Sequence, residues 1–263
     1  AVALDSGRAS SMAALSCCID ELRSGATDMM VCVGGQHDMT VLLFEALKVT
    51  GRLASGEWHS PFDVRSNGVL PGEGCGALLL KRLAEARRDG DPIHGIIRGI
   101  GCARDTSSSQ AATLAVERAL GDADLSADDV AILEATPVGQ STVDAATMEG
   151  LARAYAAHSA QRAEPIVVGS TIAQIGDTGG VCGMAALIKA LMEIEDLQVP
   201  AVPRLTQVSP YMTQHAKLMK IATQSATVSA ARSDGRVIAA VHSGGQNEVN
   251  YHVLLERGTA LKT

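Results

Sequence analysis

Residues 61–83, PFDVRSNGVLPGEGCGALLLKRL, contain the change of pattern from which the fold can be worked out. Polar and turn-forming residues fill the segment 51–68, which is therefore expected to be a long loop. The apolar run in 74–82 predicts a strand that is entered through a glycine-rich turn. Charged residues follow in 83–91 and predict a solvated helix end and turn. The stretch thus predicts a loop, a strand and a surface turn in succession.

Strands and helices alternate on both sides of this stretch. Before it, Met12, Leu15, Ile19 and Leu22 recur at helical spacing, and an apolar run in 29–35 ends in glycine. The other expected strands lie in 93–101, 126–135, 165–170, 236–243 and 249–256, and the other expected helices in 39–49, 105–120, 143–158 and 179–194. Such alternation is typical of an α/β fold whose sheet is covered on both faces.

The bulk composition limits the class of protein. The chain has 263 residues, of which 46% are hydrophobic and 2% aromatic, so its core must be built from Ala, Val, Leu, Ile and Met. The net charge of −7 and the lack of a basic block argue against a nucleic-acid partner. No apolar run approaches the roughly 18 residues that span a bilayer, and no signal peptide is visible. A cytoplasmic protein without a membrane span is therefore expected.

The six cysteines give no sign of a metal site or a disulfide framework. None forms a CxxC pair, and all lie within or beside expected helices and strands. They are interpreted as reduced, buried, small apolar residues. Neither a zinc site nor a bound cofactor is expected.

The first residues raise a separate question. The apolar run in 1–4 predicts a buried strand, and an Asp-Ser-Gly turn then leads directly into the helical pattern of LDSGRASSMAAL (4–15). Many enzymes hold a nucleophile at such a strand-to-helix turn, yet this turn carries Arg8. Because a buried strand needs neighbours on both sides and the sequence has no initiator Met, the chain is expected to be a fragment or one part of a split protein.

The stretch 61–83 also resembles the β-ketoacyl synthases, the condensing enzymes of fatty-acid and polyketide assembly. The shared pattern is Pro-Phe-Asp, a glycine turn, Gly-Glu-Gly-x-Gly and a strand that ends in Lys-Arg. Three further segments are similar to family motifs: ILEATPVGQSTVDAATMEGL (132–151), GSTIAQIGDTGGVCGMAALIKAL (169–191) and VNYHVLLE (249–256). The resemblance covers essentially all of residues 1–263. It implies one α/β domain, a thiolase-like α/β/α/β/α layered sandwich that lacks much of its N-terminal half.

The resemblance also locates the positions where family chemistry would occur. The family uses a cysteine at a helix N-terminus as acyl nucleophile, and two histidines that stabilise the enolate and the oxyanion. Residue by residue, the cysteine aligns with Arg8, the first histidine with Thr136 and the second with Asp177, and a family lysine becomes Ile172. A guanidinium has a pKa above about 12 and cannot attack a thioester. No residue is therefore expected to be catalytic by family chemistry.

Two interpretations of Arg8 remain open. Arg8 can be a receptor for a carboxylate or for the phosphate of a phosphopantetheine arm, or it can be a plug that fills the vacated pocket, which we favour. A guanidinium at a helix N-terminus is disfavoured by the helix dipole and needs a carboxylate nearby. Asp177 aligns with a family residue that sits beside the nucleophile, so the resemblance implies that Arg8 and Asp177 pair, directly or through water. The other candidates for the pocket lining are Ser10, Ile172, Gly244, Gly245, Gln246 and Asn247.

Serine and histidine residues provide weaker candidates. Ser10 could act as a nucleophile only with a base nearby, and no histidine aligns there. Thr136 is interpreted as a pocket filler. His37 follows two glycines in a loop that could face a site, whereas His252 is interpreted as a packed strand residue.

The leading hypothesis is a catalytically silent ketosynthase-like subunit of a fatty-acid or polyketide synthase, comparable to a chain-length factor, which supports a partner's acyl tunnel and dimer. Its expected partners are a chain that carries the N-terminal half, a ketosynthase-type subunit, or both, and an acyl carrier protein whose phosphopantetheine arm visits the assembly. One alternative is a remodelled transferase, cyclase or hydrolase that uses Arg8 and Asp177 on carrier-bound acyl groups. Another is a module that only recruits the carrier protein.

Overall fold

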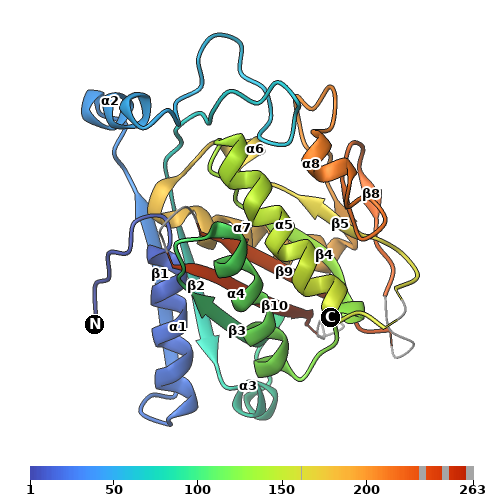
Figure 1. The fold of residues 1–263 in the computed structure, drawn as a ribbon. Coiled ribbons are helices and arrows are strands. Elements are labelled where there is room, and N and C mark those ends of the chain that lie inside the picture. The colour runs from blue at the N-terminus through green and yellow to red at the C-terminus, as the bar shows by residue number, and fades with distance from the viewer. Residues whose placement is uncertain (161, 231–234, 245–248, 259–263) are drawn as a thin grey trace.

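The computed structural model describes residues 1–160, 162–230, 235–244 and 249–258, and its largest element is a six-stranded sheet (Figure 1). The strand order is β3-β10-β9-β4-β5-β7. These strands are β3 (Gly95–Ala103), β4 (Val130–Ala135), β5 (Ile166–Gly169), β7 (Met219–Ile221), β9 (Ile238–Ser243) and β10 (Asn250–Arg257). The strands β4, β5, β7 and β9 run parallel, whereas β10 is antiparallel to both of its neighbours. Every position of β4 and β9 is buried, as expected for strands covered on both faces.

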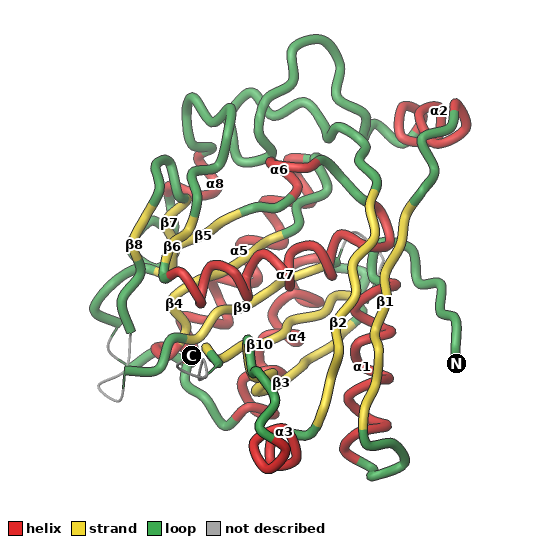
Figure 2. The backbone as a smooth tube through the Cα atoms, turned by 180° about the vertical axis from the view of Figure 1, so that it is seen from behind, coloured by secondary structure: helices red, strands yellow, loops and turns green. Residues whose placement is uncertain are grey.

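Helices cover both faces of this sheet. On one face lie α4 (Ser108–Ala123) and α5 (Ser141–Ala157), and on the other lie α1 (Ser10–Arg23) and α7 (Cys182–Asp196) (Figures 1 and 2). Two aliphatic clusters fill the two interfaces, and successive residues of β9 point alternately into one and the other. The α/β class predicted from the alternating pattern is therefore confirmed.

A second, smaller sheet makes a further layer beyond α1 and α7. It consists of β1 (Met29–Gln36) and β2 (Gly74–Lys81), which pair antiparallel along their whole length (Figure 2). Met30 and Leu80 face inward and pack on the cluster that includes α1 and α7. The opposite face is open, because Val31 is 63% exposed. The layers run helix, sheet, helix, sheet, which is four of the five layers that the resemblance implies.

Short elements connect these layers. They are α2 (Val41–Val49), α3 (Leu83–Asp89), a 3₁₀ turn at Ala127–Asp129, α6 (Ile172–Ile175), a 3₁₀ turn at Gly179–Val181, β6 (Gln198–Val199), α8 (Pro210–Thr213) and β8 (Ala226–Thr227). The loop between α2 and β2 is ordered by Asp63, whose carboxylate accepts hydrogen bonds from the backbone N–H groups of Arg65, Thr206 and Gln207. The first half of the stretch 61–83 is thus anchored to Thr206, which lies 143 positions further along the sequence.

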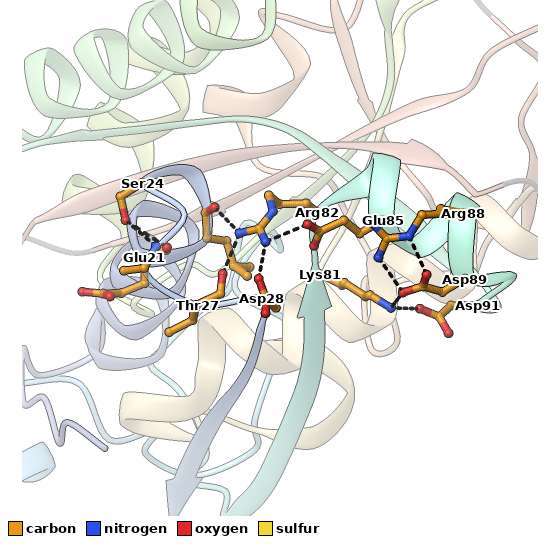
Figure 3. A network of polar contacts seen from close by, with 12 residues as sticks. Glu21, Ser24, Thr27, Asp28, Lys81, Arg82, Glu85, Arg88, Asp89 and Asp91 are labelled. Atoms are coloured by element: carbon orange, nitrogen blue, oxygen red, sulfur yellow. Dashed lines mark hydrogen bonds and ion pairs between the residues drawn. The ribbon is translucent and has the colours of Figure 1, made fainter.

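One arginine ties the small sheet to α1. Arg82 Nη1 donates to Leu22 O at 2.9 Å and to Thr27 O at 2.6 Å, at the C-terminal end of α1 and in the turn that follows (Figure 3). Its Nη2 contacts Asp28 at 2.6 Å and Glu85 at 2.8 Å. A cation at this end of a helix satisfies carbonyl oxygens that have no partner within the helix. The same view shows the ion pairs Lys81–Asp89, Lys81–Asp91 and Arg88–Asp89.

Strand β3 and helix α4 approach each other closely through glycine. A Cβ atom at Gly101 would lie 2.1 Å from Ala115 O, and one at Gly99 would lie 2.6 Å from Ala119 O. Helix α4 begins at Ser108, three residues later than the sequence suggests, because the side chain of Ser107 accepts a hydrogen bond from Gln110 N.

Three expectations from the sequence need comment. The buried strand expected in 1–4 is wrong: no strand pairs with this segment in the described structure, and Val2 is 84% exposed. The cysteines are not uniformly buried, because Cys17, Cys75 and Cys102 are exposed. Within the described residues, no helix combines the length and the apolar character that a bilayer crossing requires.

Candidate functional site

The turn before α1 places Arg8 at the start of that helix. Gly7 adopts a φ of +59°, a conformation that favours glycine, and the chain folds back between Ser6 and Arg8. The half-buried side chain of Ser10 fixes this turn, because its Oγ donates to Gly7 O at 2.7 Å and accepts from Ser6 N at 2.8 Å. Arg8 itself is 4% exposed, so a guanidinium lies buried at the N-terminus of α1.

The guanidinium of Arg8 forms an ion pair with Asp177, as the helix dipole and the family alignment together led us to expect. Arg8 Nη1 contacts Asp177 Oδ2, and both side chains are buried. A second arginine reaches the same oxygen, because Arg52 Nη2 lies 2.6 Å from Asp177 Oδ2. One carboxylate thus lies between two guanidinium groups, and this group of three side chains carries a net charge of +1.

The backbone around Asp177 is fixed by the glycine-rich part of the stretch 61–83. Asp177 N donates to Leu70 O at 2.7 Å, and Gly72 N donates to Asp177 O at 2.8 Å. The side chain also accepts a hydrogen bond at Oδ1 from Gly179 N, at 3.1 Å. The segment that decides the fold therefore also positions the acidic member of the ion cluster.

Backbone carbonyl groups hold the other side of Arg8. Its Nη2 donates to Thr136 O at 3.1 Å and to Pro137 O at 3.3 Å, which places the start of the loop after β4 directly against the guanidinium. Thr136 Oγ1 donates to His242 O at 3.3 Å, and Thr136 N donates to the same carbonyl at 3.2 Å. The three aligned positions are thus brought together, and the hydroxyl of Thr136 bonds to the backbone of β9.

A fourth charged residue, Asp144, lies buried in the same region. Its carboxylate accepts hydrogen bonds from Val138 N at 2.8 Å and Gly139 N at 3.0 Å. Burial raises the pKa of Asp144 to about 7, although these two hydrogen bonds and the charges of Arg8 and Arg52 favour the ionised form. Asp144 is therefore a carboxyl group whose charge changes near neutral pH.

Little space is left beside these residues. A cavity of about 20 Å³ is lined by Thr136, Asp144, His242 and Gly244, among others. A cavity of that size accommodates about one water molecule, and an acyl chain does not fit. Of the three aligned residues, Thr136 lines this cavity.

The remaining lining candidates lie at the edges of this region. Ile172 is buried in a small cluster with Val69 and Cys182. At Gly244 a Cβ would lie 2.4 Å from Asn250 Oδ1, so the chain and Asn250 approach each other closely there. The candidates Gly245, Gln246 and Asn247 lie outside the described residues.

Two family models match the chain. Residues 1–86 match the N-terminal domain of β-ketoacyl synthases, and residues 94–206 match the C-terminal domain. The chain belongs to the β-ketoacyl synthase family. The family resemblance drawn from the motifs is confirmed, and the layered fold is that of the thiolase-like ketosynthases.

Relatives of this ketosynthase-family chain are much longer. A phenolphthiocerol/phthiocerol polyketide synthase of Mycobacterium tuberculosis is 31% identical over 98% of this chain and 14% of its own length. A highly reducing polyketide synthase of Aspergillus terreus is 31% identical over 96% of this chain and 10% of its own length. The chain thus spans about a seventh or less of these relatives.

Solved ketosynthase structures superimpose closely. The ketosynthase domain OzmH KS7 of Streptomyces albus, from oxazolomycin synthesis, matches with a TM-score of 0.92 and 27% identity, over 100% of this chain and 47% of that one. The ishigamide ketosynthase/chain length factor matches with a TM-score of 0.83 and 20% identity, over 98% and 61%. The second similarity concerns the fold alone. The chain spans about half the length of the ketosynthase domain.

The two buried histidines of this ketosynthase-family chain bond to each other and to neighbouring side chains. His252 Nε2 lies 2.9 Å from Tyr155 Oη, and its Nδ1 lies 3.4 Å from His242 Nδ1. His242 Nε2 lies 3.2 Å from Asn250 Oδ1. Burial lowers the pKa of His242 to about 4, and burial together with His242 lowers the pKa of His252 well below its usual value. Both rings are neutral at pH 7, and His252 is the packed strand residue that the sequence suggests.

The loop histidine His37 does not face the site. Its side chain is 94% exposed and its Nδ1 lies 3.0 Å from Glu73 Oε2. Conversely, sequence reasoning missed Arg52 and Asp144. Arg52 lies in a polar loop where a single cation gives no signal, and Asp144 lies in a helical pattern where a carboxylate is usually a solvated side chain.

This arrangement can bind an anion or hold a proton, but it does not present a nucleophile beside a base. The guanidinium of Arg8 cannot attack a thioester, and Asp177 is held between two cations. The Ser10 hydroxyl bonds to the backbone of its own turn and lies 3.4 Å from the exposed Asp5 carboxylate. Two of the three aligned positions, Arg8 and Asp177, form an ion pair, and Thr136 at the third bonds through its hydroxyl to the backbone of β9.

Proposed function

We propose that this chain is a catalytically silent ketosynthase-like subunit of a polyketide or fatty-acid synthase, one domain over residues 1–263 that supports the acyl tunnel and dimer of a partner, as chain-length factors do. The observation that carries the proposal is the ion cluster at the aligned positions, where Arg8 and Asp177 contact each other. Arg8 stands at the position of the family nucleophile and Asp177 at that of the second family histidine, and their charges thus neutralise each other.

The energetics of the cluster support silence. Separating Arg8 from Asp177 to admit a substrate would take the carboxylate away from a buried guanidinium, while Asp177 keeps Arg52; loss of one member of a buried ion pair costs on the order of 3–5 kcal/mol. A carboxylate substrate could replace Asp177 at Arg8 only by meeting that cost. The cluster is therefore a plug whose opening needs a large compensating interaction.

The open face of the small sheet supports a polypeptide partner. Met29, Val31 and Val33 of β1 are 53%, 63% and 54% exposed, and Leu79 of β2 is 66% exposed. Four apolar side chains on one face of a two-stranded sheet form an interaction surface, because a sheet of two strands is marginal in water by itself. A chain that carries a ketosynthase N-terminal half, or a ketosynthase-type subunit, would supply the missing cover. An acyl carrier protein would bring its phosphopantetheine arm to this cytoplasmic assembly.

Intact-protein mass spectrometry tests the silence. The chain is incubated with acyl and malonyl carrier proteins, with an active ketosynthase as positive control. We expect the mass of this chain to stay unchanged and no malonyl decarboxylation above the rate without protein. An acyl adduct on any residue of the chain would disprove the proposal.

Association measurements test the partner surface. Val31→Glu and Leu79→Glu place charges on the open sheet face and should weaken binding to a ketosynthase-type partner by about tenfold or more. Val49→Glu is the matched control, because Val49 lies on α2 and is 84% exposed. Equal binding by all three variants would show that the partner does not use this face.

One observation favours a second candidate, a remodelled enzyme that acts on carrier-bound acyl groups. Asp144 has a pKa of about 7 beside Arg8 and Arg52, and groups with such shifts are enriched at functional sites. In that case Arg8 and Asp177 would handle the acyl group and its proton. Turnover of acyl carrier substrates that disappears in both Arg8→Ala and Asp177→Ala would favour this candidate over the silent subunit.

A further inference from the structure

A groove of about 580 Å³ runs along α7 and is separate from the ion cluster in its lining, which includes none of the three aligned residues. It is bounded by α7, by the start of β2 and by the segments of β6 and β8. Its wall is mainly apolar and includes Ile175, Ile188 and Met192. A pocket of this size and lining is in the range that binds small molecules or single side chains.

A buried carboxylate lines this groove. Glu193 is 2% exposed, although it lies on α7 among apolar residues. Lys189 Nζ lies 2.8 Å from Glu193 Oε1, whereas Oε2 accepts no hydrogen bond from any residue that the structure describes. A buried acceptor without a donor costs free energy that a bound donor would recover.

The single cation in this cluster is shared. Lys189 Nζ also pairs with Glu134 Oε1, and Glu134 Oε2 accepts from Thr171 N at 3.0 Å and from Thr171 Oγ1 at 2.9 Å. Two carboxylates thus share one ammonium group, which leaves the buried cluster one negative charge in excess when both are ionised. While Glu193 is protonated it shares a hydrogen bond with Glu134; once Glu193 is ionised, its Oε2 lacks a donor and the cluster lacks a second cation.

The rest of the groove has the same sign. Glu73 at the start of β2 and Asp196 at the end of α7 are the other charged residues that line it. Burial and the neighbouring Glu134 carboxylate raise the pKa of Glu193 to about 8, whereas Lys189 acts in the opposite direction. A cation in the groove would therefore stabilise the ionised form of Glu193.

We propose that this groove binds an ammonium group carried on an unbranched apolar stem, with the ammonium at Glu193 Oε2 and the stem along Ile188 and Met192. The ammonium supplies the missing donor and the missing charge, and the stem covers the apolar wall. A carboxylate or phosphate at the end of the stem would meet Glu73, Glu193 and Asp196 and be repelled. Free alkylamines and lysine side chains of a partner polypeptide share this chemistry.

Titration calorimetry with probes of equal length tests the proposal. The purified chain is titrated with n-hexylammonium, n-hexanol and n-hexanoate at pH 8. We expect the ammonium to bind roughly tenfold more tightly than the alcohol, and the carboxylate to bind more weakly still. Equal affinities, or preference for hexanoate, would identify an acyl-chain groove and overturn the proposal.

Two variants and a matched control assign the selectivity to its residue. Glu193→Gln keeps the shape and removes the charge, and should reduce the preference for the ammonium to within about twofold. Glu195→Gln makes the same change two residues further on, outside the groove lining, and should keep the preference. Met192→Lys alters a side chain that is 59% exposed, so folding is unaffected, and should weaken hexylammonium binding about fivefold. Retained selectivity in Glu193→Gln or unweakened binding in Met192→Lys would contradict the assignment.

The pH dependence supplies an independent readout. Glu193 must lose its proton to pair with the ligand; the charged groups that contact it are Glu134 and Lys189, and Glu73 and Asp196 line the same groove. Affinity for hexylammonium should therefore rise roughly tenfold between pH 6.5 and 8.5, and the rise should vanish in Glu193→Gln. A fall in affinity over this range would refute the proposal. In the same assay, tighter binding of acetyl-Val-Lys-Val-amide than of hexylammonium would indicate a partner polypeptide, and the reverse order a free amine.

Discussion

Replacing Asp177 by Asn should destabilise the fold far more than replacing either arginine that contacts it. The substitution removes the one carboxylate that lies against both Arg8 and Arg52, and leaves two cations in a region where the Arg8 side chain is 5% exposed. Arg8 keeps its hydrogen bonds to two carbonyl oxygens, at 3.1 and 3.3 Å, but these acceptors carry no charge. Loss of one member of a buried ion pair costs about 3–5 kcal/mol. With an m-value of about 3 kcal/mol/M, the urea midpoint should fall by roughly 1–2 M.

The contrast with Arg8→Met makes this prediction specific. In that variant Asp177 keeps its contact with Arg52 at 2.6 Å, so no charge is left without a partner, and we expect a loss of only about 1–2 kcal/mol. Urea unfolding followed by the fluorescence of Trp58, the single tryptophan, gives both values. Asp28→Asn, at an ion pair whose Asp28 side chain is 89% exposed, controls for the loss of a surface pair. A midpoint for Asp177→Asn equal to that of Arg8→Met would refute the reasoning.

Three further predictions concern the scaffold. Between pH 7 and 5 His242 should contribute a stability loss of about 2 kcal/mol, because its pKa is about 4 in the fold and about 6.5 when unfolded, so the unfolded chain binds the proton first. Asp144 and Glu193, whose pKa values are raised in the fold, act in the opposite direction, so the contribution is measured as a difference: between pH 7 and 5, urea unfolding of His242→Gln should change in favour of the lower pH by about 2 kcal/mol relative to the unsubstituted chain. Gly101→Ala should lower the free energy of unfolding by about 2 kcal/mol or more, because the added Cβ meets the α4 backbone. Gly121→Ala, with open space around the added Cβ, should raise it by about 0.5–1 kcal/mol, and thermal unfolding measures both changes. Arg82→Met should lower the free energy of unfolding by about 1–2 kcal/mol, because the contacts with the end of α1 are lost. The control Arg88→Met, at an exposed ion pair, should lower it by less than about 0.5 kcal/mol, and equal values would contradict the role given to Arg82.

Local pattern was sufficient for most of the fold. The segments predicted as strands in 126–135 and 236–243 contain β4 and β9, because continuous apolar runs are what strands covered on both faces require. The apolar run in 1–4 has the same local character but is exposed, since no neighbouring strand lies beside it in the described structure. Periodicity reports what a segment can bury, and only tertiary contacts decide whether it is buried.

At the candidate site, the ion pair of Arg8 and Asp177 could be predicted from the sequence. A guanidinium at a helix start needs a carboxylate, and the family alignment pointed to Asp177 as that carboxylate, which identified the pair. Arg52 could not be found in this way, because its partner lies 125 positions away in the sequence and a loop cation is usually solvated. Glu193 was missed because it lies in the helix expected over 179–194, where a buried carboxylate has no local signature.

The presence of Arg52 changes what the ion cluster implies about the site. If Arg8 and Asp177 formed an isolated pair, each would depend equally on the other, and neither could be replaced first without leaving a buried charge. Because Arg52 also contacts Asp177, Arg8 can be replaced while Asp177 stays neutralised, whereas Asp177 cannot be replaced while both arginines remain. A thiol at position 8 is therefore compatible with this surrounding, but an imidazole at position 177 is not. Under the proposed silent role, the obstacle to condensing chemistry would lie in Asp177 and Arg52 together, and Arg8→Cys, which introduces the nucleophile alone, should show no condensation.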